Sequence, residues 1–237
     1  MAKNGYDMLD AGAFRRVRRR MLRRLLPDFV AERAVYRRRR DGQLHVVELA
    51  PYLRGHFEVD LGLHFEGVPS FPSLLDGADR GAWVCALRHR LCHDGRRPTL
   101  WSYGEAIAEA ERTIKVIAEA ALAAFDREAK WESGEALLAA LPPDLVRDDS
   151  RIFAQIFDAS TIEEQQRLIE SMAMHRLLPA WDPLPGSMAL LLAYLARAHG
   201  RPPSLVGEYL SLFAGDRRPW GPPWQEMARA LAAAVSG

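Results

Sequence analysis

The sequence predicts an α+β protein, in which helices cover a three- to four-stranded antiparallel meander and an all-helical C-terminal subdomain follows. Three patterns lead to this fold class. Residues 56–65 alternate apolar and polar side chains, residues 102–127 carry one long apolar stripe, and residues 144–237 show helical patterns throughout. The apolar face of an alternating strand must be buried, and a long amphipathic helix can cover it.

The predicted sheet is built on three strands, at residues 35–39, 44–50 and 56–65. Asp41-Gly42 lies at the first reversal and Arg54-Gly55 at the second, and Asp-Gly supplies the positive φ that a tight hairpin needs. The third strand has two distinct faces. Phe57, Val59, Leu61, Leu63 and Phe65 form the apolar one, and His56, Glu58, Asp60 and His64 form the polar one.

This polar face has two interpretations. Its histidines and carboxylates, with His45 from the neighbouring strand, could hold a metal ion. Same-face neighbours on one strand are about 6.6–7 Å apart, so such a site needs a ligand from a second strand. The simpler interpretation is that Glu58 and Asp60 pair with arginines of residues 35–40 across the strands. We favour the second.

A basic helix is predicted before the sheet, at residues 11–26. Its apolar residues recur every three or four positions, and Pro27 stops it. The other faces are nearly all arginine and include Arg15, Arg16, Arg19, Arg20 and Arg23. This surface would either follow the phosphates of a nucleic acid or be a solvated face whose arginine stems lie over apolar neighbours.

Residues 82–93 also admit two interpretations. As a helix, Cys85, His89, Cys92 and His93 would share one face and offer zinc ligands. As a strand, the two cysteines separate and the segment becomes the fourth strand of the sheet. The spacing lacks the usual C-x₂₋₄-C form of zinc sites. We therefore expect a strand and no bound cofactor.

Residues 102–127 form the longest predicted helix, and a short one is expected at residues 134–141. Ser102 and Glu105 have the spacing of a capping box at the start of the long helix. Its apolar stripe can lie across the apolar face of the meander. The stripe consists of Ile107, Ala110, Ile114, Ile117, Ala121 and Phe125. Together with the sheet, these helices make up a predicted domain of residues 1–143.

The C-terminal subdomain, residues 144–237, is expected to pack on the sheet domain. Helices are predicted at residues 150–157, 162–174, 188–199, 204–213 and 225–235. Residues 188–199 are apolar nearly all round, which is typical of a helix at the centre of a helical layer.

A proline-rich segment near the C-terminus, RRPWGPPW, is the predicted protein-binding surface. Tryptophan and arginine dominate the binding energy of protein interfaces, and prolines would hold them in place. The expected contact residues are Arg217, Arg218, Trp220 and Trp224. The alternative is that both tryptophans pack inward.

Composition limits the classes of function. The net charge of +1 predicts no general attraction to nucleic acid or to anionic lipid. Two cysteines form no disulfide framework, and no stretch resembles a signal peptide or a membrane span, so we expect a cytoplasmic protein. Only three of the 32 basic residues are lysine, a bias typical of GC-rich bacterial genes. The common nucleotide-binding, zinc-protease and nucleophile-elbow motifs do not occur, and no catalytic residue is predicted.

About the first 141 residues resemble an uncharacterised bacterial domain-of-unknown-function family of small α+β proteins. The similarity lies in a basic first helix followed by VYRRRRDGQLHVVEL, GHFEVDLGLHF, a strand ending in RHRL, a Trp-led long helix and ESGEALLAAL. Some members are encoded near toxin, immunity or defence genes. The resemblance implies an immunity or defence role and transfers no catalytic residue.

The predicted function is therefore a non-catalytic protein that acts by protein–protein interaction. Two alternatives remain open. One is nucleic-acid binding through the arginine-rich helix, and the other is a metal-dependent enzyme with a Cys/His site.

Overall fold

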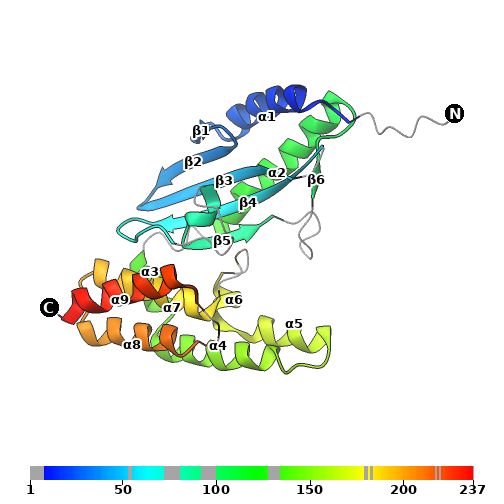
Figure 1. Cartoon of the computed structure of the whole chain (residues 1–237). Helices are drawn as coiled ribbons and strands as arrows, with labels where there is room; N and C mark the ends of the chain where they lie inside the picture. Colours follow the sequence, from blue (N-terminus) through cyan, green and yellow to red (C-terminus); the bar gives the residue numbers. More distant parts are fainter. Residues whose placement is uncertain are drawn as a thin grey trace.

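The computed structural model describes residues 8–52, 55–71, 81–91, 100–127, 134–178, 181, 184–216, 218 and 220–236. Within these residues the fold is α+β, as predicted, with an antiparallel sheet and mainly helical C-terminal residues. Figure 1 shows the sheet in the upper half of the molecule and the C-terminal helices gathered below it. No described helix combines the length and the apolar character needed to cross a lipid bilayer.

The sheet is a meander in the order β1-β2-β3-β4-β5, and β6 pairs with the start of β4. Its strands are β1 (Val30–Glu32), β2 (Val35–Arg40), β3 (Gln43–Pro51), β4 (His56–Phe65), β5 (Leu87–Arg90) and β6 (Trp101–Ser102). The three predicted strands are present as β2, β3 and β4, and both residues of the predicted Asp41-Gly42 reversal have positive φ. β1 and β6 were not predicted, because three and two residues are too few to show alternation.

Helix α2 (Ile107–Arg127) covers the apolar face of the sheet, and α1 (Ala11–Leu25) packs beside it (Figure 1). The apolar residues of β4 and the stripe of α2 from Ala110 to Phe125 belong to one buried core, whereas Ile107, the first residue of the predicted stripe, is 52% exposed. The ring of Phe14 on α1 stacks 4.1 Å from that of Tyr103 and lies 4.9 Å from that of Phe57. The carboxylate of Asp10 caps α1 by accepting the N–H groups of Gly12 and Ala13.

The predicted start of the long helix is wrong by five residues. Ser102 pairs with His56 in β6, so it cannot also open a helix. Its hydroxyl accepts the N–H of Gly104 at 3.0 Å, and Gly104 turns the chain with a φ of +78°. The N–H of Glu105 is bound by the carboxylate of Glu109 at 2.8 Å, so the capping box of Ser102 and Glu105 does not form.

The predicted strand at residues 82–93 is confirmed only in its centre, as β5. The chain first makes a 3₁₀ turn, η1 (Gly81–Val84), which lies on the outer face of the sheet, opposite α2. The carboxylate of Glu48 accepts the N–H of Ala82 at 2.9 Å and thereby holds this turn. Ala82 and Cys85 form a small second core with Val46, so the middle of this outer face is covered.

Seven helices make up the described part of the chain after residue 133. They are α3 (Gly134–Ala140), α4 (Pro143–Ile156), α5 (Ile162–Ser171), α6 (Ala173–Leu177), α7 (Pro185–Ala198), α8 (Pro203–Ala214) and α9 (Pro222–Ser236). α7 is buried on every side and α3, α4 and α8 pack on it, which confirms its predicted central position. The division into domains after residue 143 stays a prediction.

Two helix boundaries in this part differ from the prediction. α4 begins seven residues early because Pro143 occupies its first turn, where a proline starts a helix instead of ending one. The helix predicted at residues 162–174 is broken at Met172, which is extended. The buried carboxylate of Asp149 accepts the N–H groups of Ala173 and Met174, both at 2.7 Å, and so caps α6 from α4.

Aromatic rings join the helices to the sheet. Phe71, which follows β4, lies 5.3 Å from Trp224, and Phe125 of α2 lies 6.0 Å from Trp181. His45 of β3 stacks on the ring of Phe125, with the two ring centres 4.5 Å apart. Burial, and then the charges of Arg38 and Arg40, lower the pKa of His45 to about 4.

We expect the stability of the protein to fall on acidification because of His45. The unfolded side chain titrates near pH 6.5, so between pH 6.5 and 4 the unfolded chain binds a proton that the folded chain does not. This group therefore stabilises the fold fully above pH 6.5 and loses its contribution as the pH falls, by up to about 1.4 kcal/mol per pH unit. Urea denaturation from pH 7 to pH 4 should show this slope.

His45→Gln should make the slope shallower, because the variant carries no titrating group at this position. Burial also lowers the pKa of His64, so part of the slope will remain. Equal slopes for the variant and the wild-type protein would contradict this role of His45.

Candidate functional site

The two tryptophans of the predicted binding surface lie in the core. Trp220 is 8% exposed and Trp224 is 5% exposed, and their rings pack 4.7 Å apart. Trp220 also packs on Phe213 at 5.4 Å. Neither indole is available to a partner in this arrangement, so the inward-packing alternative describes them. Of the predicted contact residues Arg218 remains accessible, and Arg217 lies outside the described residues.

Arg218 instead lines a pocket of about 550 Å³ between α4, the start of α7 and the end of α8. Its wall is apolar, and three arginines and one carboxylate surround it. The wall consists of Phe153, Ala154, Phe157, Pro185 and Leu212, and the charged residues are Arg147, Arg151, Asp216 and Arg218. A cavity of about 300–1,000 Å³ with apolar walls and few polar groups is typical of binding sites.

Two phenylalanines form the aromatic part of the pocket wall. Phe157 is 68% exposed at the end of α4, and its ring lies edge-on to Phe153 at 5.3 Å. Neither residue was among the predicted contact residues. Their spacing is i and i+4, and Arg147 and Arg151 share that spacing on the same helix. This pattern could have indicated an aromatic and basic surface.

The polar end of the pocket holds Asp216 and Arg218. The guanidinium of Arg218 lies 4.3 Å from the centre of the Phe153 ring and 5.4 Å from that of Trp220. Its Nε is 3.9 Å from Oδ1 of Asp216, which is too long for a hydrogen bond. Burial lowers the pKa of Arg218, and the charge of Asp216 opposes this effect.

Several atoms at this end of the pocket are buried without a hydrogen bond to any described residue. They are Nε and Nη2 of Arg218, Oδ2 of Asp216 and the indole nitrogen of Trp220. A buried polar group without a partner costs about 1–3 kcal/mol. These atoms have less than 1 Å² of accessible surface each, so this packing lowers stability and the atoms are not open to a ligand in this arrangement.

Gly186 in the first turn of α7 makes room for this arrangement. A Cβ at this position would overlap Oδ2 of Asp216 and would lie 2.8 Å from the indole nitrogen of Trp220. The carboxylate therefore lies at the amino end of α7, where the helix dipole favours a negative charge.

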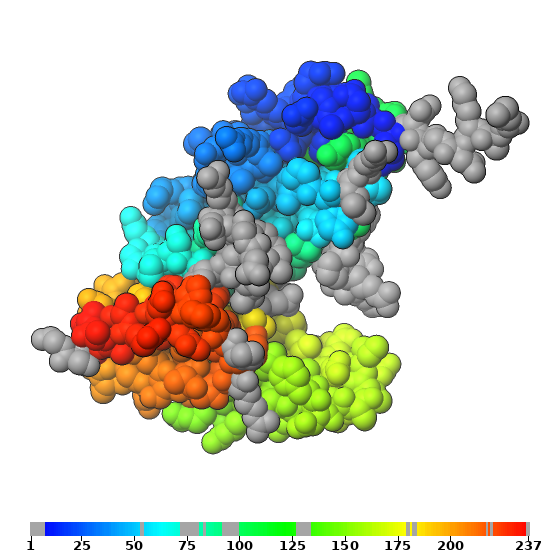
Figure 2. Space-filling model, viewed as in Figure 1, coloured from blue at the N-terminus to red at the C-terminus, as the bar shows by residue number. Residues whose placement is uncertain are grey.

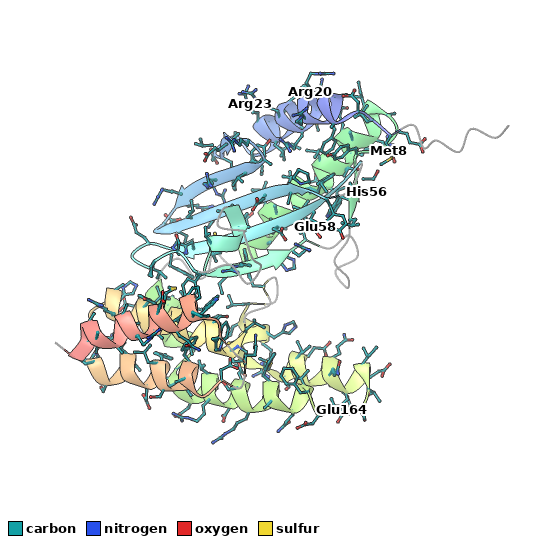
Figure 3. The ribbon with its side chains drawn as sticks, viewed as in Figure 1. Met8, Arg20, Arg23, His56, Glu58 and Glu164 are labelled. Atoms are coloured by element: carbon teal, nitrogen blue, oxygen red, sulfur yellow. The ribbon has the colours of Figure 1, made fainter. Side chains whose placement is uncertain are left out.

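The basic helix α1 presents a second charged surface. It buries Phe14, Val17, Met21 and Leu22 and exposes Arg15, Arg16, Arg19, Arg20 and Arg23. Figure 3 labels Arg20 and Arg23, which lie along α1 at the top of the molecule. Arg20 forms an ion pair with Glu111 of α2. Arg16, Arg19, Arg20 and Arg23 line a shallow hollow of about 480 Å³.

The polar residues of β4 are engaged with the protein itself. Glu58 and Asp60 pair with Arg90 of β5, at 2.6 Å and 2.9 Å, and not with an arginine of residues 35–40 as predicted. The reason is the register, which places Arg90 directly opposite Asp60. Nδ1 of His64 accepts the N–H of Ala86, and Nε2 donates to the carbonyl of Val68.

His45 does not join this polar face, because its register partner is Leu63 on the face covered by α2. Figure 3 shows Glu58 on the sheet and His56 at the end of β4 beside β6. The side chains that could have bound a metal ion are thus divided between two faces of the sheet.

The predicted Cys/His set is divided in the same way. Sγ of Cys85 packs against the outer face at Gly62, where a Cβ would lie 2.6 Å from it. His89 is paired with Leu61 on the opposite face and lies 6.3 Å from the Trp181 ring. Cys92 and His93 fall outside the described residues. Within the described part of the chain no three His, Cys, Asp or Glu side chains are placed to hold a metal ion.

Cys85 is also poorly suited to react. Its side chain is buried, and burial raises the pKa of the thiol to about 12. The thiolate is the nucleophilic form of cysteine, and at neutral pH this residue is almost wholly protonated.

No family model matches this chain, and no curated protein or solved structure matches it. The resemblance of the first 141 residues to a bacterial α+β family therefore stays a prediction. The candidate site, the pocket beside Asp216 and Arg218, is supported by geometry alone.

We expect Gly186→Ala to destabilise the protein. The added methyl group must displace Asp216 and Trp220, and overpacking of this kind costs about 1–3 kcal/mol. The measurement is the free energy of unfolding by urea denaturation.

Gly207→Ala in the middle of α8 is the matched control. A Cβ there meets nothing within 4 Å, so the helix should gain about 0.5–1 kcal/mol. If both alanines changed the stability by the same amount and sign, the tight packing at Gly186 would be disproved.

Proposed function

We propose that this protein is a non-catalytic binding protein, and that the pocket between α4, α7 and α8 holds an apolar side chain of a partner protein. The observation that carries this proposal is the exposed Phe157 ring at the edge of an apolar pocket bordered by arginines. Buried aromatic and arginine contacts supply most of the energy of protein interfaces.

The charges around the pocket indicate the chemistry of the partner. Arg151 pairs with Asp148 at 3.1 Å, and Arg147 pairs with Asp144 and lies 3.8 Å from Glu208. These pairs are exposed. Exposed ion pairs contribute about 0–1 kcal/mol, so carboxylates of a partner can replace them at little cost. The fitting occupant is therefore an aromatic or large aliphatic side chain flanked by Asp or Glu.

The two serines in the pocket support binding rather than catalysis. The hydroxyl of Ser150 donates to the carbonyl of Val146, and that of Ser211 donates to the carbonyl of Gly207, both at 2.9 Å. An activated serine would instead donate to a neighbouring base.

The resemblance to the bacterial α+β family adds an immunity or defence role to this proposal. That role comes from the resemblance alone, which covers about the first 141 residues, whereas the pocket is built from residues 147–218.

The test is selection of peptides from a displayed random library against the wild-type protein. We expect enrichment of peptides with an aromatic residue between acidic residues. Phe157→Asp should abolish the enrichment, because it places a negative charge at the edge of the pocket beside the apolar wall. Binding of one selected peptide, measured by fluorescence anisotropy, should weaken by more than 10-fold.

Ile162→Asp is the matched control, since Ile162 is 77% exposed on the neighbouring α5 and lies outside the pocket. This variant should retain the selected peptides. The proposal is overturned if no peptide family is enriched, if the enriched peptides are basic, or if both aspartates weaken binding equally.

A further inference from the structure

The N-terminal end of the molecule concentrates positive charge. Between residues 8 and 40 there are twelve arginines and three acidic residues, although the whole chain has a net charge of only +1. In this region Asp10 caps α1, and Glu32 pairs with Arg37 on the neighbouring strand. Most of the arginine charge is therefore not compensated locally.

The fold joins the arginines of α1 to those of the sheet. Nη2 of Arg18 donates to the carbonyl of Arg33 at 3.1 Å, which holds the β1–β2 turn beside α1. Arg33 is exposed in this turn, with a φ of +56°. The basic surface thus extends from the hollow lined by Arg16, Arg19, Arg20 and Arg23 onto a second element, which sequence spacing does not reveal.

These arginines are placed to meet an external anion. Among the described residues no carboxylate forms an ion pair with Arg16, Arg19 or Arg23, whereas Arg20 is paired with Glu111. Arg16 and Arg23 are two helical turns apart, or about 10 Å along the axis. Duplex nucleic acid carries one charge for about every 1.7 Å of its axis with both strands counted, so a duplex segment of this length carries about six phosphate charges.

We propose that α1 and the β1–β2 turn bind the phosphate backbone of double-stranded nucleic acid without sequence preference. This is a second binding activity, on a surface separate from the pocket of the proposed function. Figure 2 shows α1 in dark blue at one end of the molecule and the C-terminal helices at the other.

The surroundings of the hollow favour a duplex over a single strand. Proteins that bind single strands stack the bases on exposed aromatic rings. The aromatic side chains of residues 8–40 are Phe14, Phe29 and Tyr36, and all three are buried. Among the described residues 8–40 no exposed aromatic ring is available to stack on an unpaired base, whereas guanidinium groups suffice for phosphates.

The same surface is a poor match for a membrane. A helix that binds a bilayer inserts an apolar face, and the apolar residues of α1 are instead buried against α2 and the sheet. Val30 on β1 is exposed, but it is a single side chain beside a helix whose outer face is charged.

The experiment measures the binding of the full chain to a fluorescent 20-base-pair duplex by anisotropy, at salt concentrations from 50 to 300 mM. The variant carries Arg16→Gln, Arg19→Gln and Arg23→Gln, all at exposed positions. Each phosphate contact contributes about 0.9 to the slope of log K against log salt. We expect the triple variant to lose up to about 2.7 of this slope and to bind more than 10-fold more weakly at 50 mM salt.

The matched control carries Arg167→Gln, Arg197→Gln and Arg229→Gln, which remove the same charge from exposed positions on the C-terminal helices. It should bind with the wild-type slope, and two duplexes of unrelated sequence should bind equally. Circular dichroism melting will verify that both triple variants remain folded.

Four results would overturn this inference. They are no duplex binding at 50 mM salt, the same loss of slope in both triple variants, tighter binding of a single strand than of the duplex, and binding to vesicles containing phosphatidylserine that the duplex does not displace. Each can occur whether or not the pocket binds a partner protein.

Discussion

The contact between the apolar face of the sheet and α2 is the constraint on which the rest of the structure depends. Phe57, Val59, Leu61, Leu63 and Phe65 all project from one side of β4, and leaving them in water would cost about 1.5–3 kcal/mol for each large side chain. α2 covers them with its own stripe, and α1 then fills the remaining edge with Phe14 and its neighbours. Because α1 turns Phe14, Val17, Met21 and Leu22 into this core, most of its arginines face water.

The C-terminal helices depend on a second set of buried groups. Other parts of the chain surround α7. In the proline-rich segment, Trp220 packs against Phe213 and Trp224 packs against Phe71. This packing brings the chain between α8 and α9 back across the first turn of α7, where Gly186 leaves space for Asp216. The pocket forms where this segment crosses α7. One of its sides is α4, and the other includes Asp216 and Arg218, which follow α8.

Regular periodicity predicted the fold well, and contacts between distant residues limited the prediction of the site. Alternation located β4, the reversal at Asp41-Gly42 located the two strands before it, and the distribution of apolar residues located α1, α2 and α7, because β4 and these helices are each ten residues or longer. The break at Met172 could not be predicted, because the carboxylate that caps α6 belongs to Asp149, more than twenty residues away. The partner of Glu58 and Asp60 was assigned to the wrong strand for a similar reason, since the register with β5 is set by tertiary packing. Tryptophan indicated an interface because its large ring buries much apolar surface. The same large ring also stabilises a buried core.

The charge distribution links the two proposed surfaces. The net charge of the chain is only +1, but its N-terminal end is basic. The acidic residues that balance this charge are spread over the rest of the chain. At a physiological Debye length of about 8 Å, charges at one end of the molecule have little effect on binding at the other. α1 and α4 lie at opposite ends of the molecule, so a partner seated in the pocket would leave the arginine hollow uncovered (Figure 1). The placement of the two proposed surfaces therefore leaves room for a protein and a polyanion to be bound at the same time.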